Sequence, residues 1–325
     1  MKAILCKQYG PPDSLVLEDL PPLKAGKGQV VVSVKAAGVN FPDTLIIQNK
    51  YQFKPALPFS PGSECAGIVK EAGEGVTAVK PGDSVIALTT YGSFAEEIVI
   101  QEAECIPLPN GVDHKLAAGF MLTYGTSYYA LKNRAQLQPS ETLLILGAGG
   151  GVGSAAIELG KLMGARVIAC ASSDEKLAAC KQLGADELIN YETEDLRERI
   201  KHLTHQNGVD VVYDAVGGRY AEPAVRGLGW NGRYLVVGFA TGEIPSIPLN
   251  LTLLKGCSIV GVFWGAFMRK EPKASAQNHA QLLTWLATGK LTPLISAVYP
   301  LAQAPRALKD LMERKAKGKV VLVTG

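Results

Sequence analysis

The sequence has no long hydrophobic run, no closely spaced pair of cysteines and no large excess of charge of one sign. The stretch closest to a membrane span, residues 258–268, contains two glycines and is far shorter than the ~18 residues such a span requires. The apolar stretch before Lys7 is only four residues long, so the N-terminus does not resemble a secretory signal. These absences argue against a membrane-bound or exported protein and favour a cytoplasmic location.

The six cysteines are dispersed, at positions 6, 65, 105, 170, 180 and 257. Without a CxxC pair, neither a disulfide framework nor a thiolate metal site is indicated. Lysine and arginine number 33 against 30 aspartate and glutamate, a formal net charge of +3. Proteins that follow nucleic-acid phosphates carry a concentrated basic excess, so nucleic acid is not expected as a main partner.

The sequence is rich in glycine, with 35 residues, and 47% of the chain is hydrophobic. The first third consists of short β-rich segments separated by Pro/Gly turns, which is typical of a mainly β domain. A helical stretch at residues 116–132 follows. Apolar strands then alternate with helices, which predicts an α/β domain with a doubly wound parallel sheet of the Rossmann type. These strands are expected at residues 143–146, 166–169, 187–190, 209–214, 233–237 and 258–262.

The tail from residue 272 reads as two helical stretches and a final strand at residues 319–323. It is too short to form a domain by itself. We therefore expect it to fold back onto the N-terminal β domain.

A glycine-rich turn, residues 147–153 (GAGGGVG), follows the first strand of the alternation. Read as AxGxxG from Ala148, it places Gly150 where the backbone approaches a pyrophosphate, and Gly153 where helix and strand pack closely. Gly151 and Val152 begin the following helix, whose N-terminus attracts phosphate. A flexible loop could contain the same glycines, but the strand before and the helix after favour a dinucleotide-binding site.

The end of the second strand indicates which dinucleotide is bound. An acidic residue there favours NADH by binding the ribose 2′-hydroxyl, but this chain has Ala171. Ser172, Ser173 and Lys176 can instead bind a 2′-phosphate, and Tyr191, after the third strand, can close the other side. NADPH is therefore the expected cofactor.

Two features leave alternatives open at this strand end. Ser172 and Glu175 have the spacing of a helix capping box, which would account for the serines without any ligand. Asp174 and Glu175 also supply carboxylates that could suit NADH.

Several motifs resemble those of the medium-chain dehydrogenase/reductases, and within them the zinc-free quinone oxidoreductases. They are residues 36–43 (AAGVNFPD), 61–67 (PGSECAG), 81–85 (PGDSV), 147–153, 236–240 (VVGFA) and 260–265 (VGVFWG). The match spans the whole chain, with one departure at Glu158, where that branch usually has glutamine.

The resemblance implies a GroES-like catalytic domain of residues 1–118 and 263–325, and a Rossmann domain of residues 119–262. The active site is then expected in the cleft between these domains. The resemblance also implies a homodimer joined through the edges of the Rossmann sheets, near residues 249–262.

Zinc-dependent members of the superfamily have cysteine at the position of Asn40 and histidine at that of Ser63, so the resemblance implies that no zinc is bound. The loop of four cysteines that holds their structural zinc is also missing. His202 and His205 have helical spacing, but we expect them on a polar surface helix and not in a metal site.

Without a metal to stabilise an alkoxide, the easier reaction is hydride transfer from NADPH to an electron-poor acceptor such as a quinone. The resemblance implies that Asn40, Tyr51 and Thr123 lie near the nicotinamide, where Asn40 or Tyr51 could donate to a developing oxyanion. Asn40 could instead fix a loop through backbone hydrogen bonds, and Tyr51 could be a packing lid.

The resemblance also implies cofactor contacts from two segments near the ends of the fifth and sixth strands. Their residues are Gly238, Phe239, Ala240, Val262, Phe263 and Trp264. Phe239 and Trp264 could stack on a flat acceptor or belong to the core. Lys319 could contact a cofactor phosphate or lie at a solvated helix end.

Two other functions are consistent with the sequence. One is NADPH-dependent reduction of an activated C=C bond in an alkenal, an enone or an enoyl-CoA, for which Arg269, Lys270 and Lys273 could bind the acyl carrier. The same three residues also read as an exposed loop. The other is an NADPH-binding protein with little turnover, such as a cofactor store, a lens-type structural protein or an RNA binder.

Overall fold

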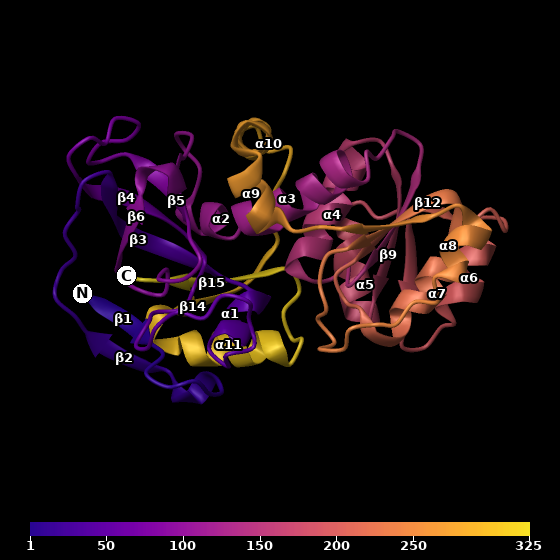
Figure 1. Cartoon of the computed structure of the whole chain (residues 1–325), viewed down its shortest axis with the longest axis horizontal. Helices are drawn as coiled ribbons and strands as arrows, with labels where there is room; N and C mark the ends of the chain where they lie inside the picture. The colour runs from indigo at the N-terminus through magenta and orange to yellow at the C-terminus, as the bar shows by residue number, and fades with distance from the viewer. The chain divides into compact units, whose positions relative to one another are not determined.

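The computed structural model describes the whole chain, Met1–Gly325, which forms two compact units (Figure 1). Unit 1 consists of Met1–Leu122 and Leu283–Gly325, and unit 2 of Thr123–Leu282. The expected domain boundary after residue 118 lies close to the observed one, whereas the expected boundary after residue 262 lies well before Leu282. The two units are described separately below.

Unit 1 is built on a seven-stranded sheet with the order β14-β15-β3-β4-β5-β7, in which β6 also pairs with β3. Its pairs are antiparallel except for β14 and β15, which run parallel. A two-stranded sheet, β1-β2, stands apart. The strands are β1 (Lys2–Leu5), β2 (Val16–Asp19), β3 (Gln29–Val39), β4 (Glu64–Ala72), β5 (Ser84–Leu88), β6 (Glu97–Gln101), β7 (Cys105–Pro107), β14 (Ile295–Pro300) and β15 (Lys319–Val323).

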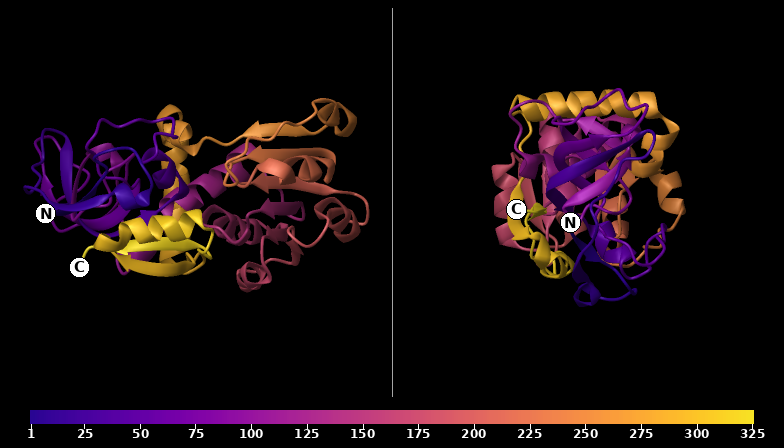
Figure 2. Two further views of the ribbon diagram at one scale, coloured as in Figure 1. Left: turned by 90° about the horizontal axis from the view of Figure 1, so that it is seen from below. Right: turned by 90° about the vertical axis from the view of Figure 1, so that its left-hand side faces the viewer.

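Three helices accompany these strands, α1 (Phe41–Ile46), α2 (His114–Ala118) and α11 (Ala304–Met312). Most residues of β3 and β15 are buried, and one face of each strand shares a core with Ala304, Ala307 and Leu308 of α11 (Figure 2). The expected strand at residues 319–323 is confirmed, and its antiparallel pairing with β3 places the tail on the N-terminal domain. Strand β14 was not expected, because its side chains alternate only between half-buried and exposed.

Unit 2 contains a six-stranded parallel sheet with the order β10-β9-β8-β11-β12-β13. Strand order reverses between β8 and β11, which is where doubly wound sheets bind ligands. The strands are β8 (Thr142–Leu146), β9 (Arg166–Ala171), β10 (Glu187–Asn190), β11 (Val209–Asp214), β12 (Leu228–Val236) and β13 (Ser258–Gly261). All six expected strands and the expected doubly wound sheet are confirmed.

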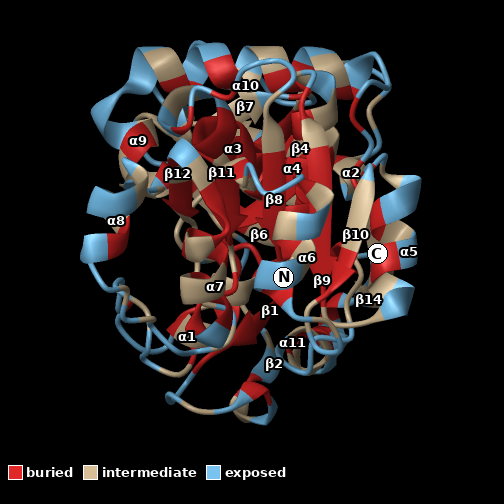
Figure 3. Cartoon of the chain, turned by 90° about the vertical axis from the view of Figure 1, so that its right-hand side faces the viewer, coloured by how far each residue is buried: buried red, intermediate tan, exposed pale blue.

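The helices between these strands are α4 (Gly151–Leu162), α5 (Asp174–Gln182), α6 (Leu196–Leu203), α7 (Ala221–Arg226) and α8 (Asn250–Lys255). Leu143–Leu146 of β8 are fully buried, and Figure 3 shows buried strands beneath helices whose outer faces are exposed. Continuous apolar strands are explained by this cover on both faces. No helix of the chain has the length and apolar character needed to cross a membrane.

The expected helical stretch at residues 116–132 is divided into three elements. Helix α2 stops at Gly119, α3 spans Met121–Tyr128, and the π-helical segment η3 spans Tyr129–Arg134. A glycine at the helix end explains the first break, because glycine is the poorest helix former after proline.

Helices α9 (Trp264–Lys270) and α10 (Pro272–Ala287) explain why unit 2 extends beyond residue 262. The ring of Phe267 stacks on Tyr129 with centroids 4.1 Å apart. Trp264 fills the space beside Gly125. If residue 125 had a side chain, its Cβ would lie 2.5 Å from the indole of Trp264.

Candidate functional site

The glycine-rich turn, residues 147–153, connects β8 to the N-terminus of α4 beside the reversal of strand order. Gly147 has a φ of +74°, a conformation that favours glycine. A Cβ on Gly153 would lie 2.2 Å from the carbonyl oxygen of Gly147, so only glycine lets α4 pack against the turn this closely. The helix therefore begins directly on the turn, as the motif predicts.

The N-terminus of α4 is suited to bind an anion. No side chain caps it, and its first turn contains no acidic residue. The backbone N–H groups at a helix start and the positive end of the helix dipole bind phosphate. Together with the turn's position beside the strand-order reversal, these features fit a dinucleotide pyrophosphate.

Lys176 from α5 lies along the same turn. The lysine side chain approaches the turn so closely that a side chain at position 149 would place its Cβ 2.9 Å from Cβ of Lys176. The Lys176 ammonium donates a hydrogen bond to Oγ of Ser172 over 3.4 Å. Ser172 follows directly on Ala171, the last residue of β9. The ends of β8 and β9 thus bring a cation and a hydroxyl together beside the glycine turn.

The cap of α5 differs from the expected capping box. Ser173, and not Ser172, is the N-cap, and its Oγ accepts from the backbone N–H of Lys176 over 3.4 Å. The helix begins one residue later than the Ser172/Glu175 spacing suggested, so that interpretation was wrong. Capping thus accounts for Ser173 and leaves Ser172 to interact with Lys176.

The carboxylate of Asp174 is held by a neighbouring strand. Its Oδ1 accepts from Nδ2 of Asn190, the last residue of β10, over 2.8 Å. An Asp174 side chain committed to this bond is less suited to receive a ribose hydroxyl.

Tyr191 lies beside two residues that the sequence reasoning missed. Its ring is 4.3 Å from that of Tyr220, and the guanidinium of Arg219 lies over the Tyr220 ring at 5.0 Å. Arg219 also pairs with Glu192 over 2.6 Å and stays largely exposed. The signal that could have indicated them is the pair Gly217-Gly218 after β11, with φ values of +69° and +59°.

The backbone of residues 238–240 is tied to the loop after β11. The N–H groups of Gly238 and Ala240 donate to the carbonyls of Asp214 and Ala215, each over 3.2 Å. Val262 similarly donates to the carbonyl of Val236 over 3.0 Å. Backbone hydrogen bonds therefore fix both segments at the carboxyl ends of β12 and β13.

The two aromatic residues considered for stacking lie in different environments. Trp264 is buried against Gly125, with its ring 6.0 Å from that of His279, so its side chain belongs to the core. Phe239 packs against Gly217, where an added Cβ would be 2.9 Å from its ring. Phe263 is about half exposed at the start of α9.

Unit 1 contains a second cluster, in which five buried polar residues from three separate chain segments meet. They come from the β3–α1 junction, the start of β4 and the start of β15, and are Asn40, Asp43, Ser63, Glu64 and Lys319. The pairing of β3 with both β4 and β15 brings these segments side by side. We call this group the buried polar cluster.

A salt bridge lies at the centre of this cluster. Nζ of Lys319 is 2.7 Å from Oε1 of Glu64, with the side chains 4% and 0% exposed. The ammonium also donates to Oδ1 of Asn40 over 2.6 Å and to the carbonyl of Val39 over 3.3 Å. Lys319 is therefore not at a solvated helix end, and its three protons have partners within unit 1.

The amide of Asn40 is also engaged within the cluster. Its Nδ2 donates to Oε1 of Glu64 over 3.0 Å and to the carbonyl of Gly38 over 3.3 Å. The backbone N–H of Asn40 donates to Oδ2 of Asp43 over 2.7 Å. This geometry supports the loop-fixing interpretation of Asn40 more than that of a free donor.

The other two expected catalytic residues are Tyr51 and Thr123. Tyr51 packs partly buried against the unit 1 core, with its ring 6.0 Å from that of Phe53. Thr123 is buried at the first position of unit 2. Their expected roles stay predictions.

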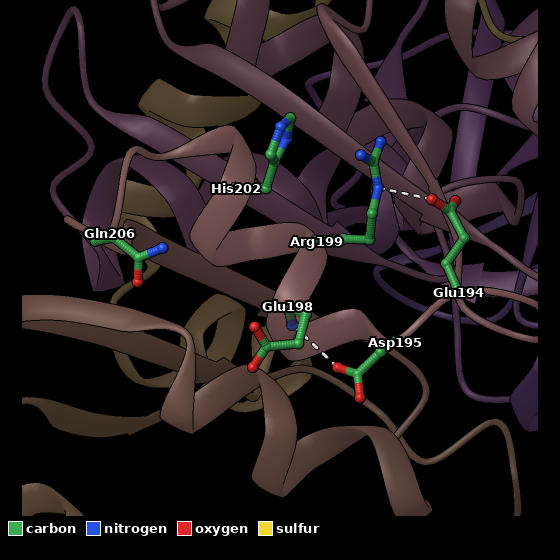
Figure 4. A pocket seen from close by; sticks show the side chains of 6 residues that line it. All are labelled: Glu194, Asp195, Glu198, Arg199, His202 and Gln206. Atoms are coloured by element: carbon green, nitrogen blue, oxygen red, sulfur yellow. Dashed lines mark hydrogen bonds and ion pairs between the residues drawn. The ribbon is translucent and has the colours of Figure 1, made fainter.

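Neither the buried polar cluster nor any other part of the chain groups three His, Cys, Asp or Glu side chains in a way that could hold a metal ion. His202 lies at a surface hollow on α6, lined also by Glu194, Asp195, Glu198, Arg199 and Gln206 (Figure 4). Arg199 pairs there with Glu194 over 2.6 Å. All six cysteines are free.

Comparison with known proteins identifies two family matches. Residues 26–110 match the alcohol dehydrogenase GroES-like domain, and residues 151–281 match the zinc-binding dehydrogenases. A quinone oxidoreductase-like protein 2 homolog from Nematostella vectensis is 39% identical over 99% of this chain and 89% of its own length. A quinone oxidoreductase from Rattus norvegicus is 33% identical over 99% of this chain and 98% of its own.

A solved structure shows the same architecture. The Escherichia coli quinone oxidoreductase complexed with NADPH has a TM-score of 0.93 and 29% identity, and the alignment covers 100% of both chains.

Proposed function

Since the chain belongs to the quinone oxidoreductase type of the medium-chain dehydrogenase/reductase family, we propose that it reduces a quinone with NADPH and without zinc. The expected architecture, a GroES-like domain with a Rossmann domain, is confirmed by the same matches. NADPH supplies the hydride when bound. The protein's part is to bind, orient and exclude water.

The observation that carries the NADPH assignment is the position of Lys176 along the glycine turn with its ammonium at Ser172. We propose that the turn and the start of α4 bind the pyrophosphate, and that Ser172, Lys176 and Tyr191 bind the 2′-phosphate. The Asp174 carboxylate accepts a hydrogen bond from Asn190, so Lys176 is the charged residue available to the 2′-phosphate. Segments 238–240 and 262–264 would then hold the nicotinamide amide.

Zinc independence is supported by what occupies the buried polar cluster. The positive charge there is the Lys319 ammonium, bonded to Asn40 and Glu64. A tetrahedral zinc site needs cysteine, histidine or carboxylate ligands with a free electron pair. Here Glu64 is neutralised by lysine, and Asn40 and Ser63 are poor zinc ligands.

Steady-state oxidation of NADPH with 1,4-benzoquinone and with crotonyl-CoA, each also run with NADH, tests the proposed function. We expect quinone turnover with a preference for NADPH, and no stoichiometric zinc by metal analysis. Turnover with the thioester alone would assign the protein to the reductases of activated C=C bonds. Tight NADPH binding with neither acceptor reduced would favour a binding protein.

Replacing Lys176 with alanine is expected to raise the KM for NADPH by about 10-fold or more, with about 2-fold or less for NADH. Only the phosphorylated cofactor loses a charge-assisted bond in this variant. The matched control is Lys181→Ala on the same helix, whose ammonium donates to the carbonyl of Asp186 over 3.1 Å. Equal effects of Lys176→Ala on both cofactors would refute the 2′-phosphate assignment.

We also propose that the protein forms a homodimer through the free edge of β13. This strand ends the sheet, and Ile259 on it is partly exposed. Four further apolar residues are strongly exposed on the neighbouring strand β12 and on α8 with its N-cap, which precede β13 along the chain. They are Trp230, Leu249, Leu253 and Leu254, which are 74%, 75%, 80% and 69% exposed. An unpaired strand edge next to such a surface is suited to pair with a second copy.

Sedimentation velocity of the full chain is expected to show a dimer, and Leu253→Asp is expected to weaken it by about 100-fold because it buries a charge. Leu17→Asp, at a 41% exposed position of β2 in unit 1, is the control and should leave the dimer intact. A monomeric wild type would refute this assembly.

A further inference from the structure

The loops after β10 and β11 meet through three side chains, Glu192, Arg219 and Tyr220, which we call the clasp. The guanidinium of Arg219 donates to Oε2 of Glu192 over 2.6 Å and to the hydroxyl of Tyr220 over 2.8 Å. The Tyr220 hydroxyl in turn donates to Oε1 of Glu192 over 2.5 Å. One carboxylate from the first loop therefore accepts hydrogen bonds from two residues of the second.

The clasp lies at the carboxyl ends of the strands that lead into the proposed cofactor site. In the sheet order β10-β9-β8-β11, strands β9 and β8 stand between the two strands whose loops meet. Tyr191 and Tyr220 share a core with Leu146 and Cys170, which lie at or next to the ends of β8 and β9. The clasp therefore borders the edge of the sheet from which the glycine turn and Ser172 begin.

The clasp is joined directly to the proposed 2′-phosphate pocket. Tyr191, a member of that pocket, precedes Glu192, and its N–H donates to the carbonyl of Ala171 at the end of β9 over 3.2 Å. The ring of Tyr191 lies 4.3 Å from that of Tyr220, and the guanidinium of Arg219 lies over the Tyr220 ring at 5.0 Å. A single aromatic ring thus separates this cation from Tyr191.

The loop that carries Arg219 has a fixed backbone. Gly217 and Gly218 have φ values of +69° and +59°, a region that favours glycine. The N–H of Gly218 donates to the carbonyl of Glu243 over 3.1 Å, and a side chain at position 218 would place its Cβ 2.9 Å from Oγ1 of Thr241. The side chain of Arg219 extends from this backbone and is 69% exposed, so it can turn to another anion without a change of the loop.

The ion pair within the clasp is weak enough to be exchanged. The side chain of Glu192 is 37% exposed, and an exposed ion pair changes an equilibrium by a factor of about 5 or less. A phosphate offers arginine more charge and two parallel hydrogen bonds. When Arg219 leaves Glu192, the Tyr220 hydroxyl still donates to that carboxylate, which therefore keeps a partner.

We propose that Arg219 is a second cation for the 2′-phosphate of NADPH, in addition to Lys176, and that it exchanges Glu192 for this phosphate when the cofactor binds. The inference rests on the proposed NADPH site and deepens it. NADH has no 2′-phosphate, so it gives Arg219 no new partner and leaves the clasp intact. Arg219 and Glu192 are then specificity-determining residues, of which the first attracts the phosphate and the second competes with it.

Binding of two cofactor fragments to the full chain tests the exchange without any turnover. Adenosine 2′,5′-bisphosphate contains the 2′-phosphate and AMP lacks it, and isothermal titration calorimetry measures both dissociation constants. We expect the wild type to bind the bisphosphate at least about 10-fold more tightly than AMP. Arg219→Ala should weaken the binding of the bisphosphate by about 10-fold and that of AMP by about 2-fold or less.

Glu192→Gln is expected to have the opposite effect. Without the competing carboxylate, the bisphosphate should bind about 3-fold more tightly, with AMP unchanged. In the Arg219→Ala background the same substitution should have no further effect, because the competition needs the arginine. Equal tightening in both backgrounds would show that Glu192 only repels the phosphate, and would overturn the exchange.

Arg226→Ala is the matched control. Arg226 lies on α7 in the same unit, and its guanidinium pairs with Glu222 over 2.6 Å, one helical turn away. Its loss should leave the affinity for both fragments unchanged. Arg219→Lys keeps the charge without the planar guanidinium and should retain part of the preference for the bisphosphate. Thermal unfolding of the variants should agree within about 3 °C, because the ion pairs concerned are exposed.

The same titrations separate failure of the exchange from failure of the proposed function. A wild-type preference for the bisphosphate that Arg219→Ala leaves unchanged would overturn the exchange while the proposed NADPH site stands on Lys176. Equal affinity of the wild type for both fragments would refute the 2′-phosphate pocket and the exchange with it. Since no acceptor is present, neither result depends on whether the protein reduces a quinone.

Discussion

Gly153→Ala is expected to abolish measurable NADPH binding and to lower the free energy of unfolding by about 3 kcal/mol. The new Cβ would lie 2.2 Å from the carbonyl oxygen of Gly147 and 2.7 Å from Cα of Ala148. Both are backbone atoms, so α4 must move away from the turn and the phosphate site is lost with it. Thermal unfolding and fluorescence titration with NADPH measure the two effects.

Gly150→Ala separates the two effects in the same turn. Its Cβ would meet only the carbonyl oxygen of Gly147, at 3.4 Å, which is at the edge of ordinary contact. We therefore expect near wild-type stability with weakened NADPH binding, because the side chain intrudes where the pyrophosphate approaches. Full NADPH binding by Gly153→Ala would show that the helix start does not hold the cofactor.

Lys319→Met is expected to cost about 3–5 kcal/mol of stability. The ammonium is bonded to Glu64, Asn40 and the Val39 carbonyl, and the Glu64 side chain is 0% exposed. Its removal leaves a buried carboxylate without a counter-charge, which is far more costly than losing a surface ion pair. Urea unfolding of the full chain measures the change.

The double variant Glu64→Gln/Lys319→Met removes both charges and should be destabilised by much less than the sum of the single variants. Glutamine can still accept from the N–H of Leu122, which Oε2 of Glu64 binds over 2.9 Å. Lys309→Met is the surface control, since its ion pair with Asp13 has side chains 43% and 66% exposed, and should cost at most about 1 kcal/mol. A Lys319→Met protein as stable as this control would refute a structural role for the buried pair.

The sequence by itself determined the doubly wound sheet and the glycine turn. Strands buried on both faces must be apolar throughout. Position 153 must be glycine, because any side chain there would place its Cβ 2.2 Å from the carbonyl oxygen of Gly147. Such requirements are local, so they are visible in the order of residues. The strand at residues 319–323 was evident for the same reason, whereas the half-exposed β14 was not.

Only the tertiary structure decided which polar groups meet. Lys319 and Glu64 are 255 residues apart along the chain, and their contact depends on β15 and β4 pairing with the same strand, β3. Arg219 and Glu192 likewise meet across two loops of unit 2. No local pattern encodes such contacts, because burial and charge compensation arise only when distant segments pack. For the same reason the sequence suggested a solvent-exposed position for Lys319, whereas in the fold it is a buried cation.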